Sequence, residues 1–193
     1  MSISDRPSAT RFFLTRALLA AENMVQAQQI LRDEGTGAGD AVSVNMTFLN
    51  QEGNRLFHNA EVGPAIIGEN PPRSQLNILT ASPGENIYHC NKYLRLKVPE
   101  VDGMIITSSD RRHAVMDNAP SPTTKQDVIN ILGDDSDKEY PIYREGKSED
   151  FVKTIATGKV IIEVLESRCK APHCWIFFKK IEIISEWKML QLH

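Results

Sequence analysis

The chain has 193 residues, of which 41% are hydrophobic and 24% are charged, and its formal net charge is −3. This length and composition are typical of a folded domain with its own core, and the charge excludes the broad basic surface of a nucleic-acid-binding protein. No apolar stretch approaches the roughly 20 residues of a membrane span, and three irregularly spaced cysteines do not form a disulfide framework. We therefore expect a cytoplasmic protein with no nucleic-acid or membrane partner.

The first predicted elements are two short helices. Apolar residues recur at helical spacing across 11–21, where Ser8 and Thr10 are available as caps. Asn23 caps a second helix across 24–31, and the glycines that follow it end the helix. The spacing of these glycines does not match a phosphate-binding loop, so we interpret them as a connection.

Two strands follow and are expected to pair as a hairpin. Residues 41–49 alternate between apolar side chains such as Val42 and polar ones such as Ser43. A turn at 51–54 leads into a returning strand at 55–62. This pattern predicts an antiparallel pair with one apolar and one polar face.

The other predicted elements are shorter. The predicted strands are 75–80, 86–93, 104–107, 140–144 and 151–157. Two further helices begin at hydroxyl caps: one starts at Ser108 or Ser109 and runs to Asn118, and one starts at Thr123 or Thr124 and spans 125–132. Because helices and strands come in blocks and do not alternate strictly, the predicted fold class is α+β, with helices packed on an antiparallel sheet.

The last segment, residues 159–193, differs from the rest of the chain. It contains 6 basic and 4 acidic residues, so its net charge is 6 − 4 = +2, which leaves −5 for residues 1–158. No clear turn signals divide it into elements. We predict a domain over 1–158 and a divergent tail over 159–193.

Several blocks of the sequence carry a resemblance to a known enzyme family. The blocks are 11–35, 42–50, 56–63, the segment HCNKYL at 89–94, the segment TSSDRR at 107–112, and 151–158. In order and spacing they resemble the penicillin (isopenicillin N) acyltransferase family of the N-terminal-nucleophile superfamily, and they are most similar to its animal beta-alanyl-dopamine/carcinine hydrolase branch. The resemblance covers residues 8–158 and includes the family's His-x-Asn and Ser-Ser-x-x-Arg segments.

The resemblance implies a fold and a reaction. The fold is a partial αββα sandwich, in which antiparallel sheets lie between helix pairs. The reaction is hydrolysis or transfer of the acyl group of a small N-acyl amine, of the beta-alanyl-amine type. In this family the precursor cuts itself at a Gly–Cys bond, and the freed cysteine attacks with its own α-amine as base. This chemistry implies no cofactor and no metal.

The resemblance also assigns roles to individual residues. From its place in the His-x-Asn segment, Asn91 is expected to be the oxyanion-hole residue, which donates a hydrogen bond to the charge that develops during acyl transfer. His89 and Tyr93 are expected to flank the substrate pocket. Ser109 and Arg112 are expected in the supporting shell, with Arg112 pairing with a carboxylate near the site.

The sequence departs from the family pattern at the nucleophile. Its cysteines follow His89, Arg168 and His173, so it contains no Gly–Cys junction. We therefore expect a fragment that is inactive alone, whose partner is either a missing N-terminal segment that carries the nucleophile or a second copy of the chain. The alternative is a non-catalytic binding or interaction protein that retains the scaffold.

Other candidate residues have simpler interpretations. Thr36 follows glycine, as a self-cleaving residue would, but a loop position accounts for it. Cys90 adjoins His89, but adjacent strand residues point to opposite faces, which favours a small buried side chain. His58 and His113 fit ordinary strand and helix patterns. Three residues of the last segment are of metal-ligand type but lack the fourth ligand of a structural zinc site: Cys169, His173 and Cys174.

Overall fold

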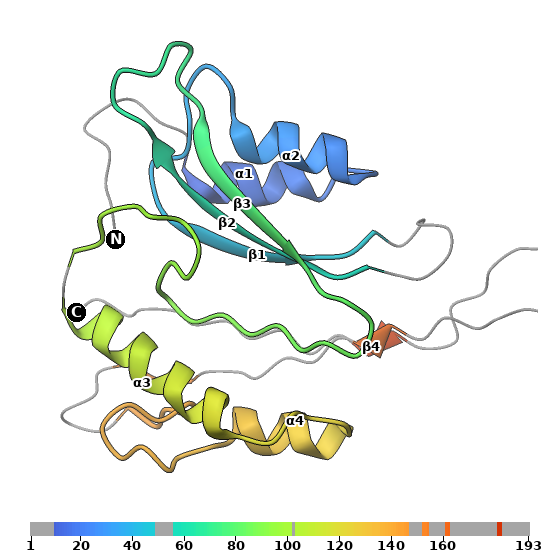
Figure 1. The fold of residues 1–193 in the computed structure, drawn as a ribbon, viewed down its shortest axis with the longest axis vertical. Helices are drawn as coiled ribbons and strands as arrows, with labels where there is room; N and C mark the ends of the chain where they lie inside the picture. Colours follow the sequence, from blue (N-terminus) through green and yellow to red (C-terminus); the bar gives the residue numbers. More distant parts are fainter. Residues whose placement is uncertain are drawn as a thin grey trace, which may run out of the picture. The chain divides into compact units, whose positions relative to one another are not determined.

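The computed structural model of the chain describes residues 10–48, 56–101, 103–146 and 152–154, together with two short strands at 161–162 and 181–182. The chain divides into two compact units, Met1–Asp117 and Asn118–His193. The first unit holds helices on an antiparallel sheet, which confirms the α+β class (Figure 1). Its elements are α1 (Arg11–Leu18), α2 (Met24–Arg32), β1 (Val42–Met46), β2 (His58–Ala65), β3 (Ser74–Thr80) and α3 (Met104–Asn118), of which the last residue belongs to the second unit.

Helices α1 and α2 form the predicted pair. The side chain of Asn23 accepts a hydrogen bond from the backbone N–H of Gln26, so its predicted role as a cap is confirmed. Helix α2 ends at Arg32 and is followed by Asp33, whose φ of 40° gives the left-handed turn that commonly closes a helix. Helix α1 ends at Leu18, three residues before its predicted end, in a turn closed by the N–H of Ala21 on the Leu18 carbonyl.

Strands β1, β2 and β3 form one antiparallel sheet in that order, so the predicted hairpin is confirmed. Strand β2 begins three residues later than predicted, and the turn at 51–54 lies outside the described residues. In the register of the sheet, Glu61 of β2 lies between Ser43 of β1 and Asn77 of β3. Because side chains alternate between the faces of a sheet, Glu61 and its neighbour Ala60 point to opposite sides.

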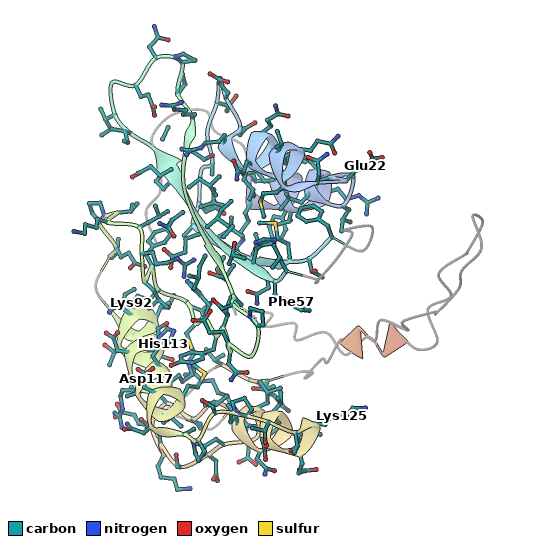
Figure 2. All side chains as sticks on the ribbon, turned by 45° about the vertical axis from the view of Figure 1, so that its right-hand side comes forward. Glu22, Phe57, Lys92, His113, Asp117 and Lys125 are labelled. Carbon is teal, nitrogen blue, oxygen red and sulfur yellow. The ribbon has the colours of Figure 1, made fainter. Side chains whose placement is uncertain are left out.

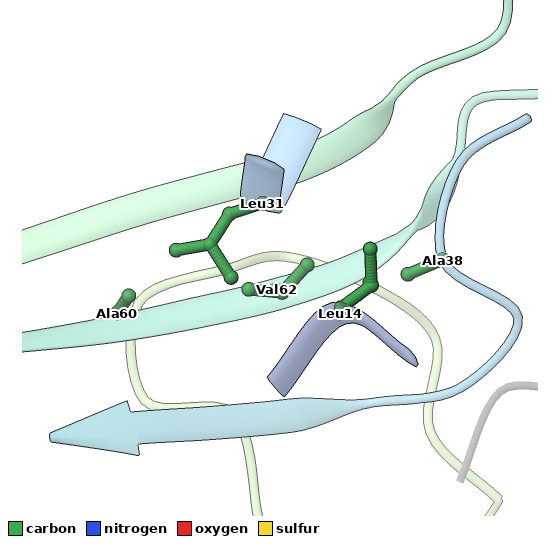
Figure 3. Close-up of a cluster of buried hydrophobic side chains, with 5 residues drawn as sticks. All are labelled: Leu14, Leu31, Ala38, Ala60 and Val62. Atoms are coloured by element: carbon green, nitrogen blue, oxygen red, sulfur yellow. The ribbon is translucent and has the colours of Figure 1, made fainter. Parts of the chain in front are cut away.

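The apolar face of the sheet packs against the helix pair. Leu14 of α1 and Leu31 of α2 form a buried cluster with Ala38, and with Ala60 and Val62 of β2 (Figure 3). Burying a leucine side chain contributes roughly 1.5–3 kcal/mol, so this cluster is the main apolar core of the unit. Partly buried side chains surround it: Leu18, Val42, Val44, Met46, Leu76 and Ile78.

The predicted strand at 104–107 is wrong. These residues form the first turn of α3, which begins at Met104, so the predicted caps Ser108 and Ser109 lie inside the helix, where both are buried. The Ser109 hydroxyl donates to the carbonyl of Ile105 at 2.8 Å, one turn earlier, and is therefore satisfied within the helix. Ile105 is exposed and Ile106 only half-buried, so the burial of Ser108, Ser109 and Arg112 further along the helix, and not burial of the isoleucines, overrides their strand preference.

The segment that follows β3 is also irregular. Residues 81–101 contain no helix and no strand, so the predicted strand at 86–93 is wrong. A turn at 82–85 opens this segment, where the N–H of Glu85 donates to the Ser82 carbonyl at 3.0 Å. The backbone N–H groups further along bind side chains of the sheet and of α3, which is the physical reason that no strand ladder is needed there.

The second unit begins with α4 (Lys125–Leu132), whose predicted cap is confirmed. The Thr124 hydroxyl accepts from the N–H of Asp127 at 3.2 Å, and the Asp127 carboxylate accepts from the N–H of Thr124 at 2.8 Å. Because this reciprocal capping box satisfies two N–H groups that the helix leaves open, it fixes where α4 starts.

The predicted strand at 140–144 is wrong, since these residues form no strand and the chain bends at 140, 142 and 143. A single antiparallel bridge joins Glu145 to Lys153, and beside it the N–H of Arg144 donates to the Thr154 hydroxyl at 2.9 Å. One short ladder pairs β4 (Ile161–Ile162) with β5 (Ile181–Glu182). Most of the predicted strand at 151–157 lies outside the described residues. Among the helices described in either unit, none has the length and apolar character needed to cross a bilayer.

Candidate active site

Residues 89–96, which include the predicted site residues, contact two elements of the first unit. One is the polar face of the sheet, through Glu61, and the other is α3, through Ser109, Arg112 and His113. The segment has no ladder or helix of its own, so these side chains determine its conformation.

Asn91 is held by α3 at two points. Its backbone N–H donates to Ser109 Oγ at 3.0 Å, and its Oδ1 accepts from Arg112 Nη2 at 3.0 Å. Ser109 is fully buried and Arg112 is 4% exposed, whereas Asn91 is exposed. Because Arg112 occupies the amide oxygen, the Asn91 nitrogen is fixed as a donor, and in the described part of the chain nothing accepts from it.

The spacing of Ser109 and Arg112 explains how one helix binds both the backbone N–H and the side-chain oxygen of Asn91. Residues three apart lie on the same helix face, so the hydroxyl and the guanidinium reach one neighbour together. Arg112 Nε also donates to the Ser108 carbonyl at 3.1 Å, which orients the guanidinium. Figure 2 shows α3 with Lys92 beside it, where Lys92 Nζ lies 2.5 Å from Asp110 Oδ1. The carboxylate partner predicted for Arg112 stays a prediction.

The side chain of His89, the first residue of the segment, is buried and binds the sheet. Its Nε2 lies 2.9 Å from Glu61 Oε1, and its Nδ1 lies 2.6 Å from the Cys90 carbonyl oxygen. Both neighbours are acceptors when Glu61 is ionised, so both ring nitrogens are engaged as donors. The His89 ring is therefore not available to activate the thiol of Cys90.

Glu61 was not predicted as a site residue, yet it organises the segment. It is fully buried, and its carboxylate accepts from the backbone N–H groups of Leu94, Arg95 and Leu96 at 2.7, 2.9 and 2.8 Å. Burial alone raises the pKa of Glu61, but these three hydrogen bonds and the one from His89 outweigh it and hold the pKa below its usual value. Glu61 is accordingly a buried carboxylate that stays charged.

His113, which fits an ordinary helix pattern in the sequence, holds the backbone beside Asn91. Its Nε2 lies 3.2 Å from the backbone nitrogen of Cys90 and accepts that N–H, so the ring must be neutral with its proton on Nδ1. Its ring meets that of His89 edge to face, with centroids 6.3 Å apart.

The pKa of His113 supports this neutral state. Burial lowers it most, and the positive charges of His89 and Arg112 act in the same direction. The Ser109 carbonyl and the Asp117 carboxylate oppose the shift, but the pKa remains below its usual value. His113 therefore accepts from the backbone at neutral pH.

Tyr93, predicted to flank the pocket, is 7% exposed and faces the sheet. Its hydroxyl donates to the Val62 carbonyl at 2.9 Å, and its backbone N–H donates to Glu100 Oε1 at 3.1 Å. Burial, followed by the carboxylates of Glu100 and Glu61, raises the pKa of Tyr93 well above 10. A side chain at Gly63 would meet the Tyr93 hydroxyl at 3.2 Å, so glycine permits this contact. Tyr93 thus packs on the sheet, and its expected place beside a substrate pocket stays a prediction.

The remaining candidates separate by location. Thr36 is exposed in the turn after α2, and its N–H donates to the Asp33 carbonyl at 3.2 Å, as expected of a loop residue. The described residues include no group of three or more metal-ligating side chains that could hold an ion. His58 packs at one end of β2, with Nδ1 2.8 Å from the Thr80 hydroxyl. The possible zinc ligands lie outside the described residues: Cys169, His173 and Cys174.

Comparison with known proteins agrees with the resemblance seen in the sequence. Residues 4–172 match the family described as acyl-coenzyme A:6-aminopenicillanic acid acyl-transferase, and the chain belongs to this family. The match runs 172 − 158 = 14 residues past the predicted domain boundary, which stays a prediction.

A curated relative adds detail to this assignment. The beta-alanyl-dopamine/carcinine hydrolase of Drosophila melanogaster is 39% identical over 149 residues, which cover 77% of this chain. The same alignment covers 38% of the relative, so the chain spans well under half the length of that protein. No solved structure matches the chain.

Two site residues escaped the sequence argument for different reasons. Glu61 had a weak signal, because it lies in the predicted strand 55–62, where a carboxylate that became buried would require hydrogen-bond partners. The alternation of the strand shows its two faces but not which segments of the chain pack on each face, so the pattern alone does not identify those partners. His113 had no such signal, since a histidine in a helix is compatible with a solvent-exposed position.

Proposed function

We propose that the chain supplies the oxyanion-binding part of an amidohydrolase or N-acyltransferase that acts on small N-acyl amines of the beta-alanyl type. The observation that supports this most is the Asn91 amide. Arg112 holds its oxygen and Ser109 holds its backbone, so the nitrogen is a donor fixed in advance on an exposed segment. A preorganised donor of this kind contributes about 3 kcal/mol to the stabilisation of an acyl-transfer transition state.

The proposed reaction takes its attacking thiol from a segment outside these 193 residues. None of the three cysteines follows a glycine, and the imidazole next to Cys90 is engaged by Glu61 and a carbonyl. By this proposal the chain alone does not hydrolyse the substrate. The remaining part of the αββα sandwich would also come from that segment, which would cover the polar side of the unit.

Complementation tests this proposal. The chain is co-expressed with the part of the Drosophila hydrolase that it does not match, the complex is purified, and the release of β-alanine from carcinine is measured. We expect release by the complex and none by either piece. Replacing Asn91 by alanine should lower kcat/KM by about 100- to 1000-fold while the complex still forms, because the charge on the substrate oxygen then loses its donor.

A matched control separates this role from general damage to the segment. Asn86 is an exposed asparagine of the same irregular stretch, and no described contact of its side chain reaches α3. Asn86→Ala should therefore leave kcat/KM unchanged. A complex that hydrolyses carcinine equally well with Asn91→Ala would overturn the role of Asn91. A purified complex that releases no β-alanine would overturn the enzymatic proposal and favour a binding protein.

A further inference from the structure

Glu61 occupies an unusual position for a charged residue. It lies in the middle of the central strand, on the face away from α1 and α2, and is fully buried. Its neighbours in register, Ser43 and Asn77, are neutral. A carboxylate in such a place costs several kcal/mol unless hydrogen bonds compensate it, so its partners must explain its presence.

Those partners use the full hydrogen-bond acceptor capacity of the Glu61 carboxylate. Oε1 accepts from the Leu94 N–H and from His89 Nε2, and Oε2 accepts from the N–H groups of Arg95 and Leu96. A carboxylate offers about four lone-pair sites, and here each has a donor. Three of the donors are consecutive backbone N–H groups, so Glu61 acts as a template for the backbone at 94–96.

The same contacts lie on both sides of Asn91 along the chain. His89 is two residues before it, and the 94–96 backbone begins three residues after it. Ser109 and Arg112 of α3 hold Asn91 itself. The position of the Asn91 amide is therefore set by α3 directly and by Glu61 through the two ends of the segment.

Arg95 reinforces the attachment of this segment to the sheet. Its Nε donates to Asn77 Oδ1 at 2.7 Å, and its Nη2 donates to the carbonyl of Asn59 at 3.2 Å. The side chain of Asn59 is itself held by the polar groups of β1, since its Nδ2 donates to Asn45 Oδ1 at 2.8 Å. The polar face of the sheet is thus a connected platform under the segment.

We propose that Glu61 is a positioning residue for the acyl-transfer site, fixing residues 89–96 so that the Asn91 amide is oriented before substrate binds. This inference rests on the proposed function for its chemical consequence. Its structural part is that Glu61 sets the conformation of the segment around Asn91, and this can be measured without an enzymatic assay.

The structural part is tested on the full chain labelled with ¹⁵N. Glu61→Gln keeps the size of the side chain but replaces one acceptor oxygen by a donor that opposes the backbone N–H groups. We expect amide hydrogen exchange at 94–96 to accelerate at least about tenfold, and the Asn91 side-chain amide signals to shift. Glu100→Gln is the control, because Glu100 also accepts a backbone N–H in this segment, from Tyr93, but contacts only that one residue there.

The catalytic consequence is tested in the co-expressed complex. Glu61→Gln should lower kcat by about 10- to 100-fold with KM within about twofold, because a misplaced donor weakens binding of the transition state more than that of the substrate. Glu61→Asp, which keeps the charge, should recover part of the lost kcat. If Glu61→Gln does not fold, His89→Gln removes one contact and keeps the three backbone hydrogen bonds, and it should still shift the Asn91 signals.

The outcomes distinguish this inference from the proposed function. Unchanged Asn91 signals in folded Glu61→Gln or His89→Gln would overturn the inference, as would a loss of kcat no larger than that of Glu100→Gln. If the Asn91 signals shift but Asn91→Ala leaves hydrolysis intact, the proposed function fails while the positioning by Glu61 stands.

Discussion

The two faces of the three-stranded sheet are stabilised in opposite ways. On one face, Leu14 and Leu31 pack onto Ala60 and Val62, and the burial of these apolar side chains stabilises the contact. On the other, Glu61 and its polar neighbours bind residues 89–96 through hydrogen bonds with defined donors and acceptors. Adjacent residues of one strand thus serve two different purposes.

The difference separates stability from geometry. Apolar burial is roughly proportional to the area buried and has no preferred direction, so it stabilises the sheet without specifying individual donors and acceptors. Hydrogen bonds lose most of their strength when distance or angle changes, so the polar face fixes the segment that carries Asn91 in one conformation. The helix face supports the sheet, and the polar face determines the candidate site.

The largest expected effect comes from near-isosteric replacements on the two faces. Glu61→Gln should lower the free energy of unfolding by about 3 kcal/mol, because it breaks a buried charged network and leaves donors facing one another. Leu31→Met, of similar volume, should cost less than about 1.5 kcal/mol. Urea denaturation of both variants measures the difference. Equal losses would show that the two faces do not differ in the way described.

Acidification should produce the next effect, through two histidines and Glu61. Burial lowers the pKa of His113 and of His58 below the usual 6.5, and hydrogen bonds lower that of Glu61 below 4.5. As the pH falls, the unfolded chain therefore takes up protons before the folded one, and the free energy of unfolding decreases below about pH 6.5 and again below about pH 4.5. These groups act in the same direction.

The contribution of His113 can be isolated. His113→Gln retains an acceptor for the Cys90 N–H but does not titrate, so its loss of stability between pH 7 and pH 5.5 should be smaller than that of the unmodified chain. Urea denaturation across this range measures the slopes. Identical slopes would mean that His113 is not held neutral in the fold.

The smallest effect is expected at the start of the helix pair on the apolar face. The Asn23 side chain caps α2, whereas that of Thr10 makes no capping hydrogen bond at α1. Asn23→Ala should therefore cost about 1 kcal/mol, and Thr10→Ala only a few tenths. The two midpoints of thermal unfolding provide the comparison, and a reversed order would contradict the observed caps.

Local patterns were sufficient for the elements whose ends depend on neighbouring residues. The Asn23 and Thr124 caps and the β1–β2 hairpin follow from signals within a few positions of each other. The start of α3 did not, because Ser109 is a good cap by type but is buried against Asn91. The sequence of residues 86–93 favours a strand. No residue close to them in the chain indicates that Glu61, some thirty residues earlier, binds residues 89–96 and holds them in an irregular conformation.

The sequence by itself determined the family, the α+β class, the helix pair with its hairpin, and the choice of Asn91, Ser109 and Arg112 as residues to consider together. Only the tertiary structure decided that α3 holds both ends of Asn91 and that a buried strand carboxylate holds the backbone around it. Caps and alternating strands arise from interactions a few residues apart, whereas the Glu61 contacts join positions about 30 residues apart in the chain and exist only once the sheet has formed.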